Sequence, residues 1–291
     1  MTGTSPKVTS RLREAIELLG GALLDLLSQE PWDSELATSQ YQQDLTIADG
    51  LDSAAGLGSN EPGVAWSVRY GRGSALAKLE AARDQVALIG AALTGGFAYA
   101  PWSLSRAAVE SAGAVYWMLD PAADTAERAR RVLIDRRTSL RWAQDHWSRR
   151  PDSPLIEAQL DHLENRLHAT RRLEAHMGIT NNARRPRWTE LCSGLLQGQA
   201  DAFYGLASGM THGELWAISM NHAVAETPET SALYKVQASD RLYLQLTKHT
   251  VVGVGEASVR TVRYLGWPHQ GLHESLEHAL TIGRETEDLL A

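Results

Sequence analysis

Apolar residues recur with helical spacing along almost the whole chain of 291 residues. In residues 8–27, for example, Leu12, Ile16, Leu19 and Leu23 lie three or four positions apart and form one apolar face. The same spacing predicts further helices over residues 74–93, 101–119, 125–149, 153–177, 188–196, 203–220, 231–264 (one or two helices) and 272–290. The pattern predicts an all-α fold, a multi-helix bundle of roughly 8–10 helices, in a single domain spanning residues 1–291.

Two segments interrupt this pattern. Glycine and small residues crowd residues 49–73, which predicts a long Gly-rich loop that serves either as a functional lid or as a disordered linker. Residues 122–187 predict a long basic helical hairpin, broken at the Arg-Pro-Asp sequence of residues 150–152. Ser153 and Pro154 suit the N-cap and the first turn of its second helix.

A line of polar side chains runs through the apolar segment 203–220. Tyr204, Ser208 and His212 recur every four residues, so they share one face of the predicted helix. Glycines recur at the same interval on a neighbouring face, which would let another helix approach closely: Gly205, Gly209 and Gly213.

Segment 98–119 has the same character, with Arg106 and Glu110 set among alanine, valine, leucine and tryptophan. Buried polar groups need hydrogen-bond partners, and buried charges need them more. We therefore expect the two segments to be neighbours in the interior, with Arg106 close to His212 in an internal polar cluster.

The leading hypothesis for this cluster is a small-molecule pocket that binds a ligand or performs acid/base catalysis; whether the protein is an enzyme stays open. In an enzyme, His212 or Glu110 would be the general acid or base, and Arg106 would hold an anionic group of the substrate. Hydroxyl and tryptophan side chains are expected to complete the ligand-binding walls: Tyr204, Ser208, Trp117 and Trp216.

Structural roles remain as alternatives for the same residues. Arg106 and Glu110 could form a solvated pair on a helix edge, and His212 could be a core histidine that Ser208 or a backbone carbonyl satisfies. The cluster would then be purely structural. The chain has no Gly-x-Ser-x-Gly sequence, which argues against a serine hydrolase.

No metal or cofactor is predicted. Two sets of potential ligands share a helix face, but both lie among arginine, glutamine and glutamate and indicate solvated faces: His269, His273 and Glu277; and Asp161, Glu164 and His168. The sequence also lacks Walker and Gly-x-Gly-x-x-Gly motifs for nucleotides.

The charge of the chain is unevenly distributed. The net charge is −7, yet residues 122–190 hold 14 arginines against 10 acidic residues. This basic hairpin could dock RNA, a phosphorylated ligand or a partner protein, or it could be a pair of salt-bridged surface helices. Because the remainder is acidic, a small-molecule ligand is favoured over nucleic acid. A homo-oligomer is left open.

The chain is expected to be cytoplasmic and to have no membrane contact. Its single cysteine, Cys192, cannot form an internal disulfide, which fits a reducing compartment. The N-terminus has no secretory signal, and no apolar run approaches the ~18–20 residues of a membrane span.

Two blocks resemble a family of uncharacterised helical proteins common in actinobacteria. They are the Ser-Arg-x3-Glu and Trp-x-Leu-Asp-Pro sequences within residues 101–131, and the Tyr-x3-Ser-x3-His-Gly sequence of residues 204–213. That resemblance implies no known activity. The layout is also similar to HEPN-type bundles, whose ribonucleases carry an Arg-x(4–6)-His motif; Arg141 with His146, and Arg171 with His176, have this spacing. This second resemblance implies an RNA-binding protein or ribonuclease as the alternative function.

Overall fold

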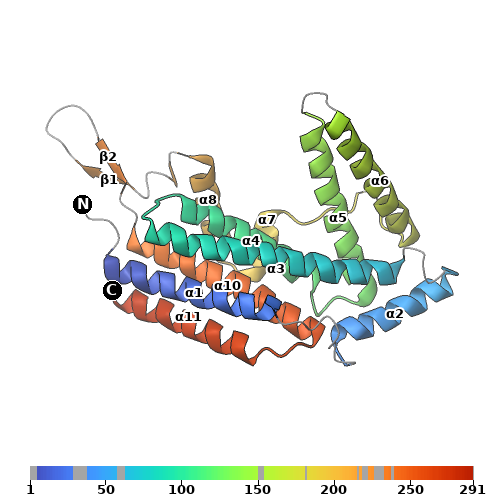
Figure 1. The fold of residues 1–291 in the computed structure, drawn as a ribbon, viewed down its shortest axis with the longest axis horizontal. Coiled ribbons are helices and arrows are strands. Elements are labelled where there is room, and N and C mark those ends of the chain that lie inside the picture. The colour runs from blue at the N-terminus through green and yellow to red at the C-terminus, as the bar shows by residue number, and fades with distance from the viewer. Residues whose placement is uncertain are drawn as a thin grey trace.

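The computed structural model describes residues 5–28, 38–57, 63–149, 154–180, 182–214, 216–217, 222–225, 233–236 and 239–290. Within these residues the chain forms ten helices and two short strands (Figure 1). The predicted all-α, multi-helix bundle is confirmed.

The helices are α1 (Pro6–Ser28), α2 (Gln40–Ala54), α3 (Val64–Thr94), α4 (Ala100–Met118), α5 (Thr125–Trp147), α6 (Pro154–His176), α7 (Trp188–Leu195), α8 (Ala200–His212), α10 (Asp240–Leu265) and α11 (Gln270–Asp288), and the strands are β1 (His222–Ala225) and β2 (Leu233–Val236).

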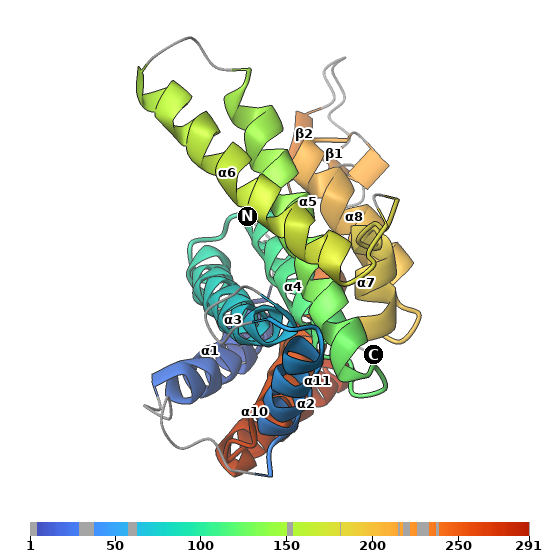
Figure 2. The same cartoon turned by 90° about the vertical axis from the view of Figure 1, so that its right-hand side faces the viewer.

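Five long helices form the body of the molecule, elongated along their common direction (Figures 1 and 2). Helix α1 packs against α3 and α11, while α4 packs against α3 and α10. Their apolar faces meet in one core, where Leu19, Leu79 and Leu246 are fully buried. The shorter helices α7 and α8 pack on α4, and Cys192 of α7 is fully buried there, with its Sγ 3.9 Å from the carbonyl oxygen of Val109.

The predicted Gly-rich loop at 49–73 is wrong at both ends. Helix α2 continues to Ala54 and α3 begins at Val64, so both ends of the predicted loop are helical. The Asp52 carboxylate accepts hydrogen bonds from the backbone nitrogens of Val64 and Ala65, at 2.8 and 3.0 Å, which satisfies the free N–H groups at the start of α3. Gly71 lies inside α3, where a Cβ would be only 2.7 Å from Cγ2 of Val132 on α5. Close packing, not a turn, accounts for this glycine.

The predicted helices over 203–220 and 231–264 are each partly wrong. Helix α8 ends at His212, because Gly213 adopts a left-handed conformation with φ of 72° and its N–H closes the last turn. Helix α10 begins only at Asp240, since residues 222–225 pair with residues 233–236 as a two-stranded antiparallel ribbon. Valine and tyrosine in these stretches favour strands.

Helices α5 and α6 project from one end of the body as the predicted long hairpin (Figures 1 and 2). The base of the hairpin is held by a buried ion pair, in which Nη1 of Arg137 lies 2.8 Å from Oε2 of Glu174. Arg137 also donates to the carbonyl oxygen of Ala183. Some of the hairpin arginines are therefore core residues and not surface charges. The proposed N-cap Ser153 lies outside the described residues.

Candidate functional site

Helices α4 and α8 lie side by side and bring four of the predicted site residues together. Arg106 is the centre of the cluster: its Nε donates to Oε1 of Glu110 at 2.8 Å, one Nη donates to the hydroxyl of Tyr204 at 3.0 Å, and the other lies 3.1 Å from Nε2 of His212. The Tyr204 hydroxyl in turn donates to the same Glu110 oxygen at 2.8 Å. The expected proximity of Arg106 and His212 is confirmed.

The cluster is not internal, however. The side chains of Arg106 and Glu110 are 18% and 19% exposed, and His212, in the last turn of α8, is exposed. The four residues form a half-buried seam along the edge of the α4–α8 contact. The apolar residues that suggested burial belong to the other faces of the two helices.

Each polar group of the seam already has a role in its hydrogen bonds. A guanidinium can only donate, so Nε2 of His212 is the acceptor of the bond from Arg106. Burial, together with the hydrogen bond to Glu110, raises the pKa of Tyr204 to about 12, so its hydroxyl stays protonated. The His212 lone pair and the Tyr204 proton are both engaged within the seam, which suits a structural link between α4 and α8 better than proton transfer.

The structure places the other three predicted ligand-binding residues differently from Tyr204. Ser208 is half-buried beside the seam, but among the described residues the hydrogen-bond partner of His212 is Arg106. Trp117 lies about 16 Å from Arg106 along α4, at a rise of 1.5 Å per residue. The guanidinium of Arg131 lies over the ring of Trp117. Trp216 lies beside a different cavity, described below.

The glycine pattern of α8 serves different purposes at its three positions. A Cβ at Gly209 would be 2.6 Å from Cβ of Ala217, so here a neighbouring segment does approach closely. Gly213 ends the helix, and a Cβ at Gly205 would meet nothing within 4 Å. The expected glycine face for a packed helix is therefore wrong except at Gly209.

A second, fully buried polar network joins α2, α5 and α10. Its centre is Asp44, whose two carboxylate oxygens lie 2.6 and 2.7 Å from two nitrogens of Arg128. Thr125 donates to one oxygen at 2.8 Å and Tyr264 to the other at 3.0 Å. The side chains of Asp44 and Arg128 are 0% and 5% exposed. The protein is therefore a helical bundle with a buried polar network. The sequence predicted such a network, but at Arg106 and His212 and not at Asp44 and Arg128.

Burial alone would raise the pKa of Asp44, but the hydrogen bonds from Arg128 and Thr125 outweigh it and hold the pKa below its ordinary value. Arg128 also donates to the carbonyl oxygens of Asp120 and Ala123, which ties α5 to the end of α4. A network this well satisfied fixes the packing of three helices and leaves no group free for a ligand. The sequence carried no signal for it beyond the presence of an arginine-rich segment.

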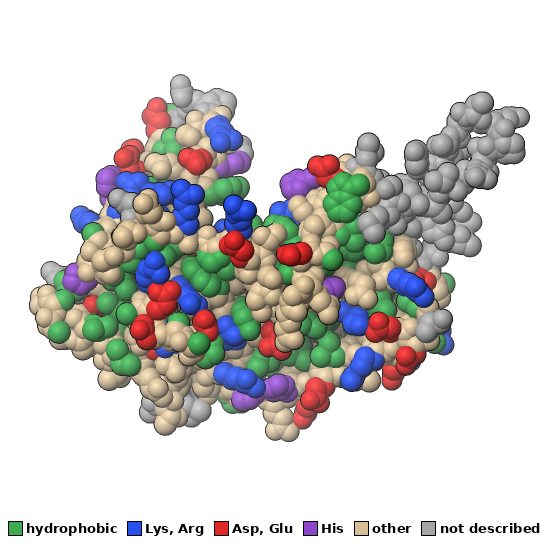
Figure 3. Space-filling view, turned by 180° about the vertical axis from the view of Figure 1, so that it is seen from behind, with side chains coloured by type: hydrophobic (Ala, Val, Ile, Leu, Met, Phe, Trp, Pro, Cys, Tyr) green, Lys and Arg blue, Asp and Glu red, His purple; other side chains and the backbone are tan. Residues whose placement is uncertain are grey.

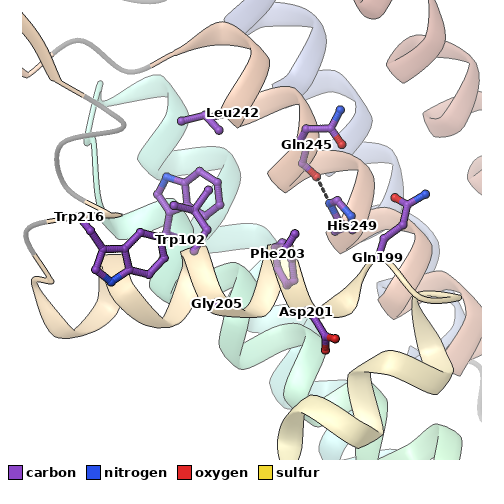
Figure 4. Close-up of a pocket in the computed structure, with 11 residues that line it drawn as sticks. Trp102, Gln199, Asp201, Phe203, Gly205, Trp216, Leu242, Gln245 and His249 are labelled. Carbon is purple, nitrogen blue, oxygen red and sulfur yellow. Dashed lines mark hydrogen bonds between the residues drawn. The ribbon is translucent and has the colours of Figure 1, made fainter.

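A cavity of about 620 Å³ opens on the other side of α8, between α4, α8 and α10 (Figure 4). Its walls are largely apolar and include both exposed and buried aromatic residues; they are Trp102, Gln199, Asp201, Ala202, Phe203, Gly205, Leu206, Trp216, Leu242, Gln245 and His249. Trp216 is the one predicted ligand-binding residue among them. The sequence did not indicate the cavity, because residues such as Trp102 and Phe203 have the pattern of ordinary core positions.

Two buried polar atoms of this cavity have no hydrogen-bond partner among the described residues: Nε1 of Trp102 and Nε2 of His249. Nδ1 of His249 lies 2.6 Å from the carbonyl oxygen of Gln245, so Nδ1 carries the proton and Nε2 is an acceptor. Burial lowers the pKa of His249, which favours this neutral form. The ring of Phe203 stacks on the imidazole with 4.9 Å between centroids.

The HEPN-like pairs lie on the projecting hairpin. Arg141 and His146 are exposed on α5, where His146 stacks on Trp142 at 5.4 Å, and Arg171 and His176 are exposed on α6. Lysine and arginine side chains gather around the base of the hairpin, beside the hollow that separates it from the α8 end of the body (Figure 3).

The potential metal ligands considered from the sequence do not assemble into a site within the described residues. No group of three or more histidine, cysteine, aspartate or glutamate side chains there is arranged to hold a metal ion. In the same part of the chain, no helix combines the length and apolar character that a bilayer-spanning segment needs.

Comparisons with protein-family models, with curated proteins and with solved structures find no match to this chain.

Proposed function

We propose that the protein binds a small, mainly apolar molecule in the cavity between α4, α8 and α10. The observation that carries this proposal is the combination of an apolar cavity of about 620 Å³ with two buried polar atoms that lack partners among the described residues. Sites for small molecules are typically ~300–1,000 Å³, largely apolar, and contain a few polar groups that orient the ligand.

The two polar atoms define the polar part of the ligand. An unsatisfied buried donor or acceptor costs about 1–3 kcal/mol, so a ligand that supplies the missing partner gains affinity. His249 would accept a hydrogen bond from a ligand hydroxyl or N–H group, and Trp102 would donate one to a ligand oxygen. A ligand group reaches Nε2 of His249 when the Phe203 ring, which stacks on the imidazole, turns aside.

The seam of Arg106, Glu110, Tyr204 and His212 supports binding indirectly. It fixes α8 against α4 along one edge, and the cavity lies along the other side of α8. In this proposal the polar residues predicted from the sequence position the helix that carries the cavity wall, and they do not touch the ligand.

The proposal is tested with a matched pair of probes, indole and benzofuran, which have nearly the same shape but differ in the presence of an N–H donor. We expect both to bind, as measured by isothermal titration calorimetry, and indole to bind roughly 2- to 10-fold more tightly, the worth of one hydrogen bond. In His249→Phe, which keeps a ring of similar size, the preference for indole should disappear.

A cavity-filling variant tests the location. Gly205 lines the cavity, and a Cβ there would meet nothing within 4 Å, so the side chain of Gly205→Leu should occupy the cavity and abolish binding of both probes. Gly50 also has open space but is exposed on α2, so Gly50→Leu is the matched control and should bind normally.

Two further variants decide between the cavity and the seam. If His212→Ala and Glu110→Gln fold normally and retain binding, the cavity proposal stands. If they lose binding while Gly205→Leu retains it, the ligand site is the seam and the cavity proposal is wrong.

A further inference from the structure

A second cavity, of about 460 Å³, lies where α5 crosses α3 and α4, away from the cavity discussed above. Its walls differ in kind, because hydroxyl groups and cations interrupt the apolar lining. The polar residues that line it are Tyr70, Ser74, Lys78, Ser111, Arg136 and Ser139, together with Asp135.

The charges of this cavity are not balanced. The Asp135 carboxylate is shared by two cations, since it lies 3.3 Å from Nζ of Lys78 and 3.0 Å from an Nη of Arg185. Arg136 is buried, and no carboxylate lies within 4 Å of it among the described residues. Among the residues that line the cavity, one carboxylate therefore accompanies two cations, Lys78 and Arg136, which leaves one positive charge in excess.

Arg136 is held in place without being neutralised. Its Nε donates to the hydroxyl of Thr170 at 2.9 Å, and its guanidinium carbon lies 4.4 Å from the ring centre of Tyr70 and 4.9 Å from that of Trp66. The two rings are themselves stacked at 5.1 Å. Stacking on aromatic faces fixes the plane of the guanidinium and offsets part of the cost of burying its charge.

Burial nevertheless lowers the pKa of Arg136 below its ordinary value, which means that its surroundings disfavour the charged form. A buried cation without a counterion is costly, and an anion beside it recovers much of that cost. The guanidinium is planar and fixed, which is the geometry that binds two oxygens of one anion.

We propose that this cavity binds a phosphate group carried by a small molecule, with Arg136 and Lys78 opposite the phosphate oxygens and the serine hydroxyls donating to them. A carboxylate has two oxygens and would leave several of these donors unused, whereas a phosphate has enough acceptor positions for all of them. The volume exceeds that of a phosphate group alone, so the remainder of the ligand also finds room.

The test uses inorganic phosphate and glycerol phosphate as probes, with acetate and chloride at equal ionic strength as controls. Binding to the native state raises the midpoint of thermal unfolding. We expect both phosphate compounds to raise it and acetate and chloride to leave it unchanged. Tighter binding of glycerol phosphate would identify a phosphorylated metabolite as the ligand class, and equal affinity would identify the free ion.

Lys78→Gln should weaken the affinity for phosphate at least tenfold in isothermal titration. Lys248→Gln is the matched control, because Lys248 also pairs with a carboxylate, that of Glu287 at 2.8 Å, but lies away from the cavity. Equal phosphate affinity of Lys78→Gln and the wild type would overturn the proposal, and so would a thermal shift that acetate produces equally.

Arg136→Gln removes the central cation but also a buried stacking partner. If this variant fails to fold, Ser111→Ala keeps the proposal testable, since it removes only one hydroxyl from the α4 wall. We expect Ser111→Ala to bind phosphate roughly 2- to 10-fold more weakly. Ser103→Ala, at another half-buried serine of α4 outside the cavity, should bind like the wild type, and identical affinities for the two serine variants would count against the proposal.

Discussion

Asp44 and Glu110 each accept hydrogen bonds from one arginine and one tyrosine, but water reaches only one of these carboxylates. The Asp44 side chain is 0% exposed, whereas that of Glu110 is 19% exposed. Solvent screens the charges of the half-buried seam, while the Asp44 network has no such screening. At the scale of single residues, we therefore expect the loss of one partner to cost more stability in the buried Asp44 network than in the half-buried seam.

Asp44→Asn removes the counterion of Arg128 and leaves that arginine buried. The loss of one partner of a buried ion pair costs about 3–5 kcal/mol, so we expect the free energy of unfolding to fall by that amount in guanidinium denaturation. Glu285→Gln is the control, because Glu285 pairs with Arg11 at the surface and its loss should cost about 0–1 kcal/mol. Equal effects of the two substitutions would show that the Asp44 pair is not a major source of stability.

The same network predicts the pH dependence of stability. Burial would raise the pKa of Asp44, but its hydrogen bonds hold the folded-state pKa below the ordinary value. A carboxyl group with a lowered pKa stabilises the fold fully above its unfolded-state pKa of about 4, and this stabilisation is lost as the pH falls through the folded-state pKa. The wild type should therefore lose more stability than Asp44→Asn on acidification below pH about 4, as measured by the denaturation midpoint at each pH.

At the scale of elements, glycine determines where α8 ends. Gly213 has a φ of 72°, which side-chain-bearing residues adopt only at a cost of about 1–2 kcal/mol. Gly213→Ala should therefore destabilise the protein by about 1 kcal/mol in denaturant titration. Gly205→Ala, in the interior of the same helix with open space around Cβ, should stabilise it by roughly 0.5–1 kcal/mol. Effects of the same sign would contradict this account of the two glycines.

The existence of most helices could be predicted from the sequence, but some of their ends could not. Apolar periodicity identified α1, α4, α5, α6, α7 and α11 within a few residues. Glycine caused the main errors, because the same residue type ends α8 at Gly213 and permits close packing inside α3 at Gly71. Only the tertiary structure distinguishes these two uses.

The candidate sites could be predicted only where local spacing carried the signal. Arg106 and Glu110 lie one turn apart, and Tyr204 and His212 share a helix face, so the sequence indicated their meeting. Asp44 and Arg128 are 84 positions apart, and neither stands out from polar neighbours. The cavities depend on how three helices leave space between them, which no pattern within a single helix encodes.

At the scale of the whole molecule, the distribution of charge distinguishes the small-molecule hypothesis from the RNA-binding hypothesis. The hairpin region is basic but the chain as a whole carries −7. Binding of RNA through arginines releases counterions and must weaken steeply as salt rises. We expect weak RNA binding, because the net charge of the chain is negative and opposes a long polyanion. Titration of the full-length protein with labelled single-stranded RNA at low and moderate salt measures this binding. Tight, salt-sensitive binding that Arg171→Ala abolishes would instead favour the HEPN-like alternative, and a gel of the same samples would reveal cleavage.

The reaction rate of Cys192 with a thiol reagent should report how often α7 separates from α4. The thiol is fully buried between α7 and α4, and burial, with a contribution from the charge of Glu110, raises its pKa to about 12. The Cys192 thiolate is the nucleophile that attacks a disulfide reagent and displaces one of its two sulfurs as a thiolate, so this cysteine can react only after α7 has separated from α4. We expect labelling by a disulfide reagent at pH 8 to be slow and independent of reagent concentration once opening limits the rate, and to become rapid in denaturant.

Fast labelling of the native protein in proportion to reagent concentration would contradict this burial. Because α7 also packs on α8, which forms one wall of the apolar cavity, a ligand in that cavity should slow the labelling. The labelling rate of the Cys192 thiol thus allows ligands of any chemistry to be screened without a dye or a tag attached to the protein.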